Sequence, residues 1–136
     1  MPDHTALAAG KKTSWILPSE SEWYKAAYYD PDKPGGAGYW RYPAKSYEIP
    51  EANINSSAPC DVESFAASPY GTYCQGGNVW EYNDAQSGGK VGLRGGSFYL
   101  NDNEAYLRST TRYDVLSAKW PNYGFRVVAL GGADEK

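Results

Sequence analysis

The sequence of 136 residues is poor in the side chains that most catalytic metal centres require. It contains one histidine, His4, and only two cysteines. A Ser-His-Asp triad would have to use this single histidine, which lies in an N-terminal segment without hydrophobic periodicity. The composition therefore excludes an iron centre with several histidine ligands within one chain, and it argues against a triad hydrolase.

Excess positive charge and long hydrophobic runs are also missing. The formal net charge is -3, so the chain has no basic field that would attract nucleic acid. No apolar run approaches the roughly 20 residues that a membrane-spanning helix needs. We therefore expect no nucleic-acid partner and no membrane span, and the composition leaves the compartment undecided.

Aromatic residues are abundant but uneven in kind. The chain has 13 Tyr and 5 Trp against 3 Phe, together with 15 Gly and 9 Pro. Because buried Tyr and Trp need partners for their polar atoms, this composition predicts an irregular domain with mixed polar and aromatic packing. We expect a flexible lead-in over 1–14, one domain over 15–130 and a disordered tail over 131–136.

The clearest local signal is the start of a helix at Ser19. Ser19 and Glu22 have the spacing of a capping box, in which each side chain accepts a hydrogen bond from the other residue's backbone N–H. Pro18 and Trp23 stand at the positions of a hydrophobic staple around this cap. We expect the helix to end near Tyr29, because the following Asp-Pro pair disfavours helix.

The second half of the chain predicts short strands over 91–98 and 123–129, and another after the glycine turn at 76–78. Period-two alternation places Glu81 on the same face as the apolar Val79. A carboxylate in that position either faces solvent at a sheet edge or meets a cation beside the turn. The pattern does not decide between these alternatives.

The two cysteines, Cys60 and Cys74, are separated by a short stretch of chain. A disulfide between them would close a small loop and add roughly 3 kcal/mol to stability. Two reduced thiols are the alternative. The choice depends on the redox state of the compartment, which the sequence does not give.

Five short motifs occur in a fixed order along the chain: Leu-Pro-Ser-Glu-Ser-Glu-Trp at 17–23, Ser-Pro-Tyr-Gly-Thr-Tyr at 68–73, Gly-Asn-Val-Trp-Glu-Tyr at 77–82, Arg-Gly-Gly-Ser-Phe at 94–98 and Gly-Phe-Arg-Val at 124–127. Together they resemble the C-terminal half of the sulfatase-modifying-factor family, which includes the formylglycine-generating enzymes. The resemblance implies an α+β fold, an irregular C-type-lectin-like domain with one clear N-terminal helix, short antiparallel strands and long loops. The match does not include the family's usual N-terminal portion, so a first strand either is dispensable or comes from elsewhere, and a homo-oligomer that completes the fold is one way to supply it.

The resemblance further implies a structural calcium site. In formylglycine-generating enzymes the motif that matches 77–81 binds calcium, which here assigns the carbonyl groups of Gly77 and Val79 and the carboxylate of Glu81 as ligands. Calcium prefers such oxygen donors. The family's fourth protein ligand falls at Cys74, a poor calcium ligand, so water or Asp84 would replace it. An ion pair of Glu81, or backbone N–H donors at the turn, is the alternative.

The family's catalytic residues do not carry over. Formylglycine-generating enzymes bind copper through two cysteines that follow the Arg-Gly-Gly-Ser motif, and these positions are Leu100 and Ala105 here. Neither side chain ligates a metal, and a serine at 97 has no oxygen chemistry without the thiolates. We therefore expect no copper or iron and favour a non-catalytic domain. The alternative is an oxidoreductase of the formylglycine-generating type that acts on protein cysteine with atypical or partner-supplied residues.

The segment over 99–122 has the composition of an antibody combining site, with Tyr and Trp for contact area and Ser, Asn and Asp for adaptable hydrogen bonds. Variable proteins of diversity-generating retroelements, which share the implied fold, bind through this region. We therefore predict a recognition or scaffold domain that contacts a protein or glycan ligand here, with ordinary core packing as the alternative. The candidate ligand-binding residues are Ser97, Tyr99, Asn101, Asp102, Tyr106, Arg108, Arg112, Tyr113 and Trp120.

Overall fold

A computed structural model of the chain describes residues 4, 14–99, 103–116 and 118–130. Asn101 and Asp102, the tail over 131–136 and most of the lead-in over 1–14 lie outside the described residues. The remainder forms one helix, a short 3-10 helix and small, mostly antiparallel sheets joined by long loops, which confirms the predicted α+β class. Among the described residues, no helix is both long and apolar enough to cross a membrane.

Helix α2 (Glu20–Tyr28) begins with the predicted capping box. The Ser19 backbone N–H donates to Glu22 Oε2 at 2.7 Å, and the Glu22 N–H donates to Ser19 Oγ at 3.2 Å. The helix ends one residue before the expected position, because Tyr29 already has extended backbone angles. Its buried face consists of Trp23, Ala27 and Tyr28, none of which has any exposed surface.

The largest sheet has four strands in the order β6-β5-β4-β7. Its central strand β4 pairs with β5 in antiparallel fashion and with β7 in parallel fashion. Two smaller sheets pair β1 with β8 and β2 with β3. The elements are β1 (Ser14–Ile16), β2 (Tyr29–Asp30), β3 (Gly38–Tyr39), β4 (Trp80–Ser87), β5 (Lys90–Arg94), the 3-10 helix η1 (Glu104–Leu107), β6 (Tyr113–Leu116), β7 (Tyr123–Phe125) and β8 (Val128–Leu130).

Two predicted strands are shorter than the sequence indicates. The strand expected over 91–98 ends at Arg94, because Gly95 and Gly96 have positive φ angles of 101° and 75° that leave the sheet geometry. The strand expected over 123–129 divides into β7 and β8, which belong to different sheets. Arg126 stands at this division and points into the interior instead of continuing a ladder.

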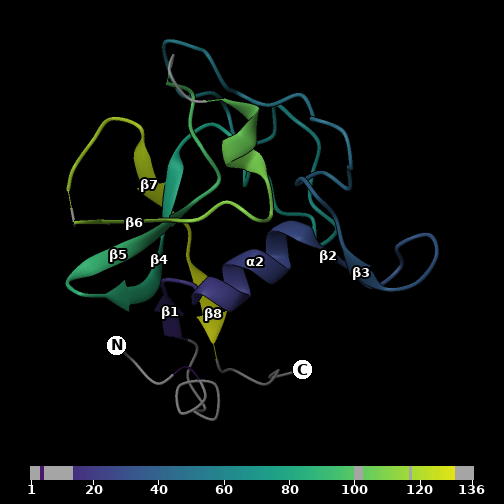
Figure 1. Cartoon of the computed structure of the whole chain (residues 1–136), viewed down its shortest axis with the longest axis horizontal. Helices are drawn as coiled ribbons and strands as arrows, with labels where there is room; N and C mark the ends of the chain where they lie inside the picture. The colour runs from purple at the N-terminus through teal and green to yellow at the C-terminus, as the bar shows by residue number, and fades with distance from the viewer. Residues whose placement is uncertain (1–3, 5–13, 100–102, 117, 131–136) are drawn as a thin grey trace.

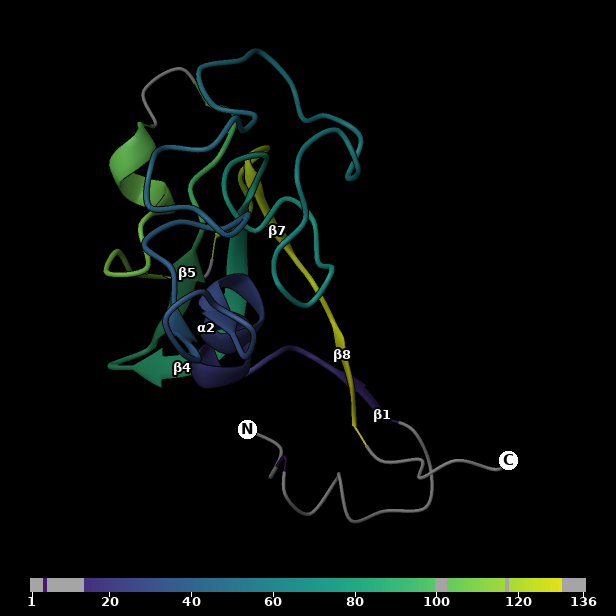
Figure 2. The ribbon, with the colours of Figure 1, turned by 90° about the vertical axis from the view of Figure 1, so that its right-hand side faces the viewer.

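Helix α2 packs beside β4, while β1 and β8 pair with each other at one end of the described domain (Figures 1 and 2). A buried arginine ties the helix start to the sheet. Arg94 donates through Nε to Glu20 Oε1 at 2.8 Å and through Nη1 to the Ser109 and Thr111 carbonyl oxygens at 2.7 and 2.6 Å. These contacts hold the helix, β5 and the segment before β6 in one unit.

The core combines aromatic rings with satisfied polar atoms. Tyr28 is fully buried, and its hydroxyl donates to the Leu107 carbonyl oxygen at 3.0 Å. Burial raises the pKa of Tyr28 far above its ordinary value, so the phenol stays protonated and remains a donor. Trp23 is equally buried and directs its indole N–H toward β4. This packing therefore keeps the donors of large aromatic residues paired inside the domain.

Candidate functional site

Glu81, on β4, lies at the centre of the best-defined polar cluster. It is only 4% exposed, and both of its carboxylate oxygens accept hydrogen bonds. Arg126 donates from Nε to Oε2 and from Nη2 to Oε1, each at 2.6 Å, and Trp23 Nε1 donates to Oε2 at 2.6 Å. The sequence leaves open whether Glu81 faces solvent, binds a metal or forms an ion pair, and in the structure it forms a buried ion pair with Arg126.

Arg126 extends this cluster to another loop. Its Nη2 also donates to the Tyr73 carbonyl oxygen at 2.9 Å. One guanidinium group therefore links β4, the loop at 73 and the junction between β7 and β8, while Trp23 adds helix α2. A bidentate Arg–carboxylate pair of this kind compensates the cost of burying the negative charge.

The glycine turn before β4 fixes where Glu81 lies. Gly77 has a φ of 77°, and a Cβ atom on it would lie 2.7 Å from the Asn53 carbonyl oxygen. Its N–H donates to the Gly95 carbonyl oxygen at 2.8 Å, and the N–H of Asn78 donates to the Asn53 carbonyl oxygen at 2.8 Å. Only glycine combines this backbone angle with so close an approach.

Cys74 lies near the same cluster as a protonated thiol. Its Sγ donates to the Val62 carbonyl oxygen at 3.0 Å. Burial, and secondly the neighbouring Cys60 thiol, raise the pKa of Cys74 to about 11, so the sulfur carries no charge near neutral pH. Both cysteines are free thiols in the structure.

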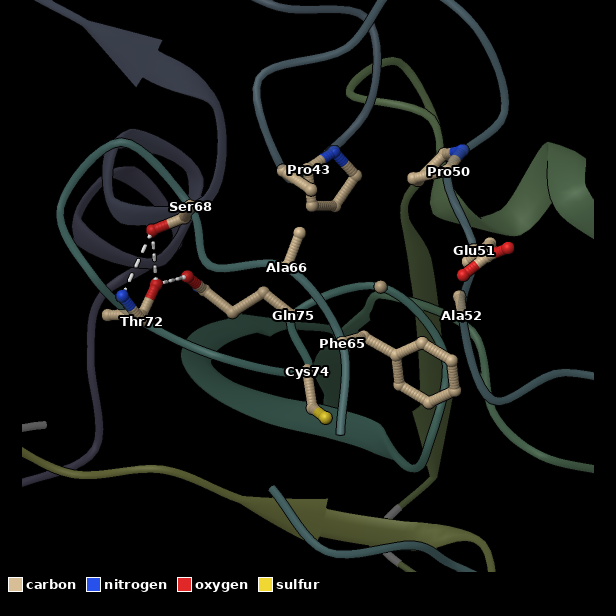
Figure 3. Close-up of a pocket in the computed structure, with 12 residues that line it drawn as sticks. Pro43, Pro50, Glu51, Ala52, Phe65, Ala66, Ser68, Thr72, Cys74 and Gln75 are labelled. Carbon is tan, nitrogen blue, oxygen red and sulfur yellow. Dashed lines mark hydrogen bonds between the residues drawn. The ribbon is translucent and has the colours of Figure 1, made fainter. Parts of the chain in front are cut away.

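The small pocket that Cys74 lines, between the loops at 43–52 and 65–76, is shown in Figure 3. Its polar side chains bond to one another: Ser68 Oγ lies 2.6 Å from Thr72 Oγ1, and Thr72 also bonds to Gln75. The Gln75 amide in turn donates to the Trp23 carbonyl oxygen at 3.2 Å. These side chains therefore support helix α2 and offer few unused groups to a ligand.

In this arrangement a calcium ion at Gly77, Val79 and Glu81 would compete with the present partners of Glu81. The Glu81 oxygens are engaged by Arg126 and Trp23, so a metal would have to displace a guanidinium group. Asp84, the substitute ligand that the sequence suggests, has Oδ2 at 2.9 Å from His4 Nε2 instead. No group of three or more His, Cys, Asp or Glu side chains in the described part of the chain could hold a metal ion. Calcium binding stays a prediction.

Two of the candidate ligand-binding tyrosines pack against β4. The ring centroids of Tyr106 and Tyr113 lie 5.3 and 5.4 Å from that of Trp80, and 5.6 Å from each other. Trp80 is 7% exposed, whereas Tyr113 is 45% exposed. This aromatic cluster anchors the segment that follows η1 to the core and leaves Tyr113 partly accessible.

The other candidates differ in exposure. Tyr99 and Trp120 are 53% and 61% exposed. Arg108 donates from Nε to the Tyr42 hydroxyl at 3.0 Å, and Arg112 forms an ion pair with Asp114 at 2.9 Å. Ser97 is fully buried, and its Oγ accepts from Asn122 Nδ2 at 3.0 Å. The structure thus places Ser97 in the core and most of the other described candidates at or near the surface.

His4 makes contacts that the sequence did not indicate. Its Nδ1 lies 3.0 Å from Glu22 Oε2, and its Nε2 lies 2.9 Å from Asp84 Oδ2, so the ring bridges α2 and β4. The hydrogen bond with Glu22 is the largest cause that raises the pKa of His4. A lone histidine in an unpatterned segment gives no signal for this bridge. The pairing of Arg126 with Glu81 is likewise visible only in the structure.

Residues 3–130 match the family model described as sulfatase-modifying factor enzyme 1-like domain. The chain belongs to this family. In alignments of 82 residues that cover 57% of this chain, this sulfatase-modifying factor domain is 37% identical to the serine/threonine-protein kinase pkn1 of Chlamydia caviae and 35% identical to pkn1 of Chlamydia pneumoniae. It covers only 12% of either kinase.

Solved structures share the fold of the domain. Treponema denticola variable protein 1 superposes with a TM-score of 0.61 at 23% identity, over 85% of this chain and 47% of that protein. The crystal structure of CarF superposes with a TM-score of 0.56 at 24% identity, over 83% of this chain and 46% of that one. The predicted C-type-lectin-like architecture is therefore confirmed, and the chain spans about half the length of these neighbours.

Proposed function

We propose that this sulfatase-modifying factor domain is a recognition or scaffold module that contacts a protein or glycan ligand through the segment over 99–122. The observation that carries the proposal is the exposure of large aromatic side chains on an anchored segment. Tyr99, Tyr113 and Trp120 are 53%, 45% and 61% exposed. We call these three side chains the exposed aromatic set.

Tyr and Trp side chains suit a binding surface because of their contact area and their low conformational entropy. Tyr and Trp offer large contact areas with few rotatable bonds, so little conformational entropy is lost when a ligand binds. The packing of Tyr106 and Tyr113 on Trp80 already orders part of the segment. The guanidinium groups of Arg108 and Arg112 on the same segment add donors for polar or anionic groups on the ligand.

The residues at the family's copper-binding positions also support a role that does not involve the activation of molecular oxygen. The positions that correspond to the family's copper-binding cysteines are Leu100 and Ala105, and neither offers a metal ligand. The alternative function is an oxidoreductase of the formylglycine-generating type whose catalytic groups are atypical or come from a partner. Oxygen consumption with copper and a cysteine-containing peptide separates the two: turnover above a copper-only control would overturn the recognition proposal.

The fold neighbours add support by analogy only, because function resides in sites and not in folds. One neighbour is called a variable protein, which agrees with a binding role for a segment on this scaffold. Association of the chain with a second copy into a homo-oligomer belongs to the same proposal. Sedimentation velocity at several protein concentrations tests this association. A monomer at every concentration would rule out the homo-oligomer.

Screening on glycan and protein arrays tests the recognition proposal. We expect a ligand whose binding weakens at least tenfold when Tyr113 or Trp120 is replaced by alanine, because truncation of a central aromatic contact typically costs more than about 1 kcal/mol. Phe125→Ala is a matched control, because Phe125 is 67% exposed on β7 and lies outside the segment. Equal losses in the control would contradict the assignment of this surface.

Calcium stabilisation remains a separate part of the proposal. If calcium binds the native state, thermal melting with millimolar calcium must give a higher midpoint than melting with chelator. An unchanged midpoint would remove calcium and leave the Arg126–Glu81 pair as the group that holds this region together.

A further inference from the structure

The β2–β3 hairpin projects from the rest of the domain (Figure 1). The segment that follows β3 carries a second pair of aromatic side chains, Trp40 and Tyr47. The Trp40 and Tyr47 rings have centroids 5.0 Å apart and planes inclined at 59°. Lys33 Nζ lies 5.1 Å from the Trp40 centroid and 4.9 Å from the Tyr47 centroid. Both distances are within the range of about 6 Å over which a ring attracts a cation. One ammonium group therefore contacts two aromatic rings.

Two hydrogen bonds fix the position of Trp40. Its backbone N–H donates to the Tyr28 carbonyl oxygen at 2.9 Å, which ties it to the end of helix α2. Its indole Nε1 donates to Asp30 Oδ2 at 3.0 Å, and Asp30 is only 7% exposed. This bond satisfies the polar edge of the indole and fixes the ring, and the carboxylate makes the local potential more favourable for a cation.

Lys33, in contrast, is held mainly by the two rings. None of the ion pairs in the described part of the chain involves its ammonium group. Its turn continues into Gly35 and Gly36, around which a Cβ atom would meet nothing within 4 Å. Tyr47 is 49% exposed, so the site is open to solvent. The lysine is thus a cation that an external one could displace.

We propose that Trp40 and Tyr47 form a binding site for a trimethylammonium group, which Lys33 occupies in the free protein. A primary ammonium is strongly hydrated and contacts a ring at one point. A trimethylammonium group is weakly hydrated, spreads its charge over three methyl groups, and is the cation that aromatic sites recognise in choline-type ligands. It therefore loses less hydration than Lys33 when it enters the site and contacts both rings at once.

This site is distinct from the segment over 99–122 and does not depend on the recognition proposal. The trimethylammonium group has two chemical sources, a free choline-type molecule and the headgroup of a choline phospholipid. Both present the same cation, so the aromatic walls alone do not select between them. The two sources differ in whether a membrane surface can reach the projecting hairpin, and an experiment with vesicles can therefore separate them.

Titration with choline chloride at constant ionic strength tests the proposal, with the Trp40 indole N–H and the Lys33 Cε signals followed by NMR. We expect both signals to shift together in the wild-type protein as choline replaces the lysine. Ethanolamine, which carries a primary ammonium, should bind more weakly. Vesicles of phosphatidylcholine, compared with vesicles of phosphatidylglycerol, report whether a lipid headgroup reaches the site.

Variants make the outcome decisive. Lys33→Ala removes the internal competitor and should tighten choline binding roughly fivefold, the order expected for one exposed cation–π contact. Tyr47→Ala should abolish binding, and because Tyr47 is half exposed, this change leaves the core intact. Lys25→Ala is the matched control, since Lys25 Nζ lies 5.5 Å from the centroid of one ring only, that of Tyr29.

The proposal fails if choline at tens of millimolar shifts neither signal in the wild-type protein, or leaves the Trp40 indole signal of Lys33→Ala unchanged. It also fails if ethanolamine binds as tightly as choline, or if Tyr47→Ala binds as well as the wild type. Choline binding without vesicle binding supports the site with a free molecule as its source. Binding of both supports the site with a lipid headgroup as a source.

Discussion

Replacement of Arg126 by methionine tests the buried ion pair most severely. Methionine keeps much of the side-chain volume but removes every donor, so Glu81, which is 4% exposed, retains only the Trp23 hydrogen bond. Removing one partner of a buried pair typically costs about 3–5 kcal/mol, because the other charge is left uncompensated. The Arg126 side chain is 23% exposed, so water can solvate part of the gap. We therefore expect about 3 kcal/mol.

Urea unfolding, followed by tryptophan fluorescence, measures this loss directly. For a domain of this size, about 3 kcal/mol corresponds to a fall of the thermal midpoint on the order of 10 °C. The double variant Glu81→Gln with Arg126→Met should recover a large part of the loss, because no charge remains buried. A loss below about 1 kcal/mol for Arg126→Met, or no recovery in the double variant, would refute the claim that this pair supports the fold.

The remaining predictions concern the glycine turn and the histidine bridge. Gly77→Ala should lose about 2 kcal/mol more than Gly88→Ala in urea unfolding, because both have positive φ angles but only the first would place a Cβ 2.7 Å from a backbone oxygen; equal losses would contradict the close approach. The His4 bridge raises the pKa of His4 above its ordinary 6.5, so its stabilisation is complete below pH 6.5 and disappears as the pH rises through the raised value. The thermal midpoint should therefore decline above pH 6.5 in the wild type and less so in His4→Ala. Partial burial pushes the pKa of Glu22 upward, but the bonds from Ser19 and His4 outweigh it and leave that pKa below its ordinary 4.5; its stabilisation is present above pH 4.5 and disappears as the pH falls through the lowered value. Identical midpoint profiles for wild type and His4→Ala would contradict the bridge.

Local structure was predictable where the decisive residues are close in sequence. The cap at Ser19 and Glu22 depends on residues three apart, and the structure has both of its hydrogen bonds. The end of β5 was less accessible: the sequence predicted a strand over 91–98, whereas the strand stops at Arg94. Interactions between residues close in sequence thus predicted the presence of the helix and strands better than the residues at which they end.

Contacts between distant residues account for most of what the sequence did not reveal. The sequence placed Glu81 beside a cation or at an edge, but the guanidinium that meets it lies 45 residues away. A carboxylate has the same pattern in either role, so spacing alone does not name its partner. His4 bonds to Glu22 across 18 residues from a segment without periodicity. Pairing of this kind depends on the sheet order, which strand patterns do not fix.

The central claim is that the exposed aromatic set on the segment over 99–122 is the recognition surface of this sulfatase-modifying factor domain. The most direct test is backbone NMR mapping of a ligand from the array screen on the wild-type protein and on Trp120→Ala, because Trp120 is 61% exposed and lies outside the Trp80 cluster. We predict shifts concentrated around Tyr99, Tyr113 and Trp120, and their loss in the variant while its thermal midpoint stays near the wild-type value. Ligand-induced shifts confined to other surfaces, or unchanged binding by the folded variant, would contradict the claim.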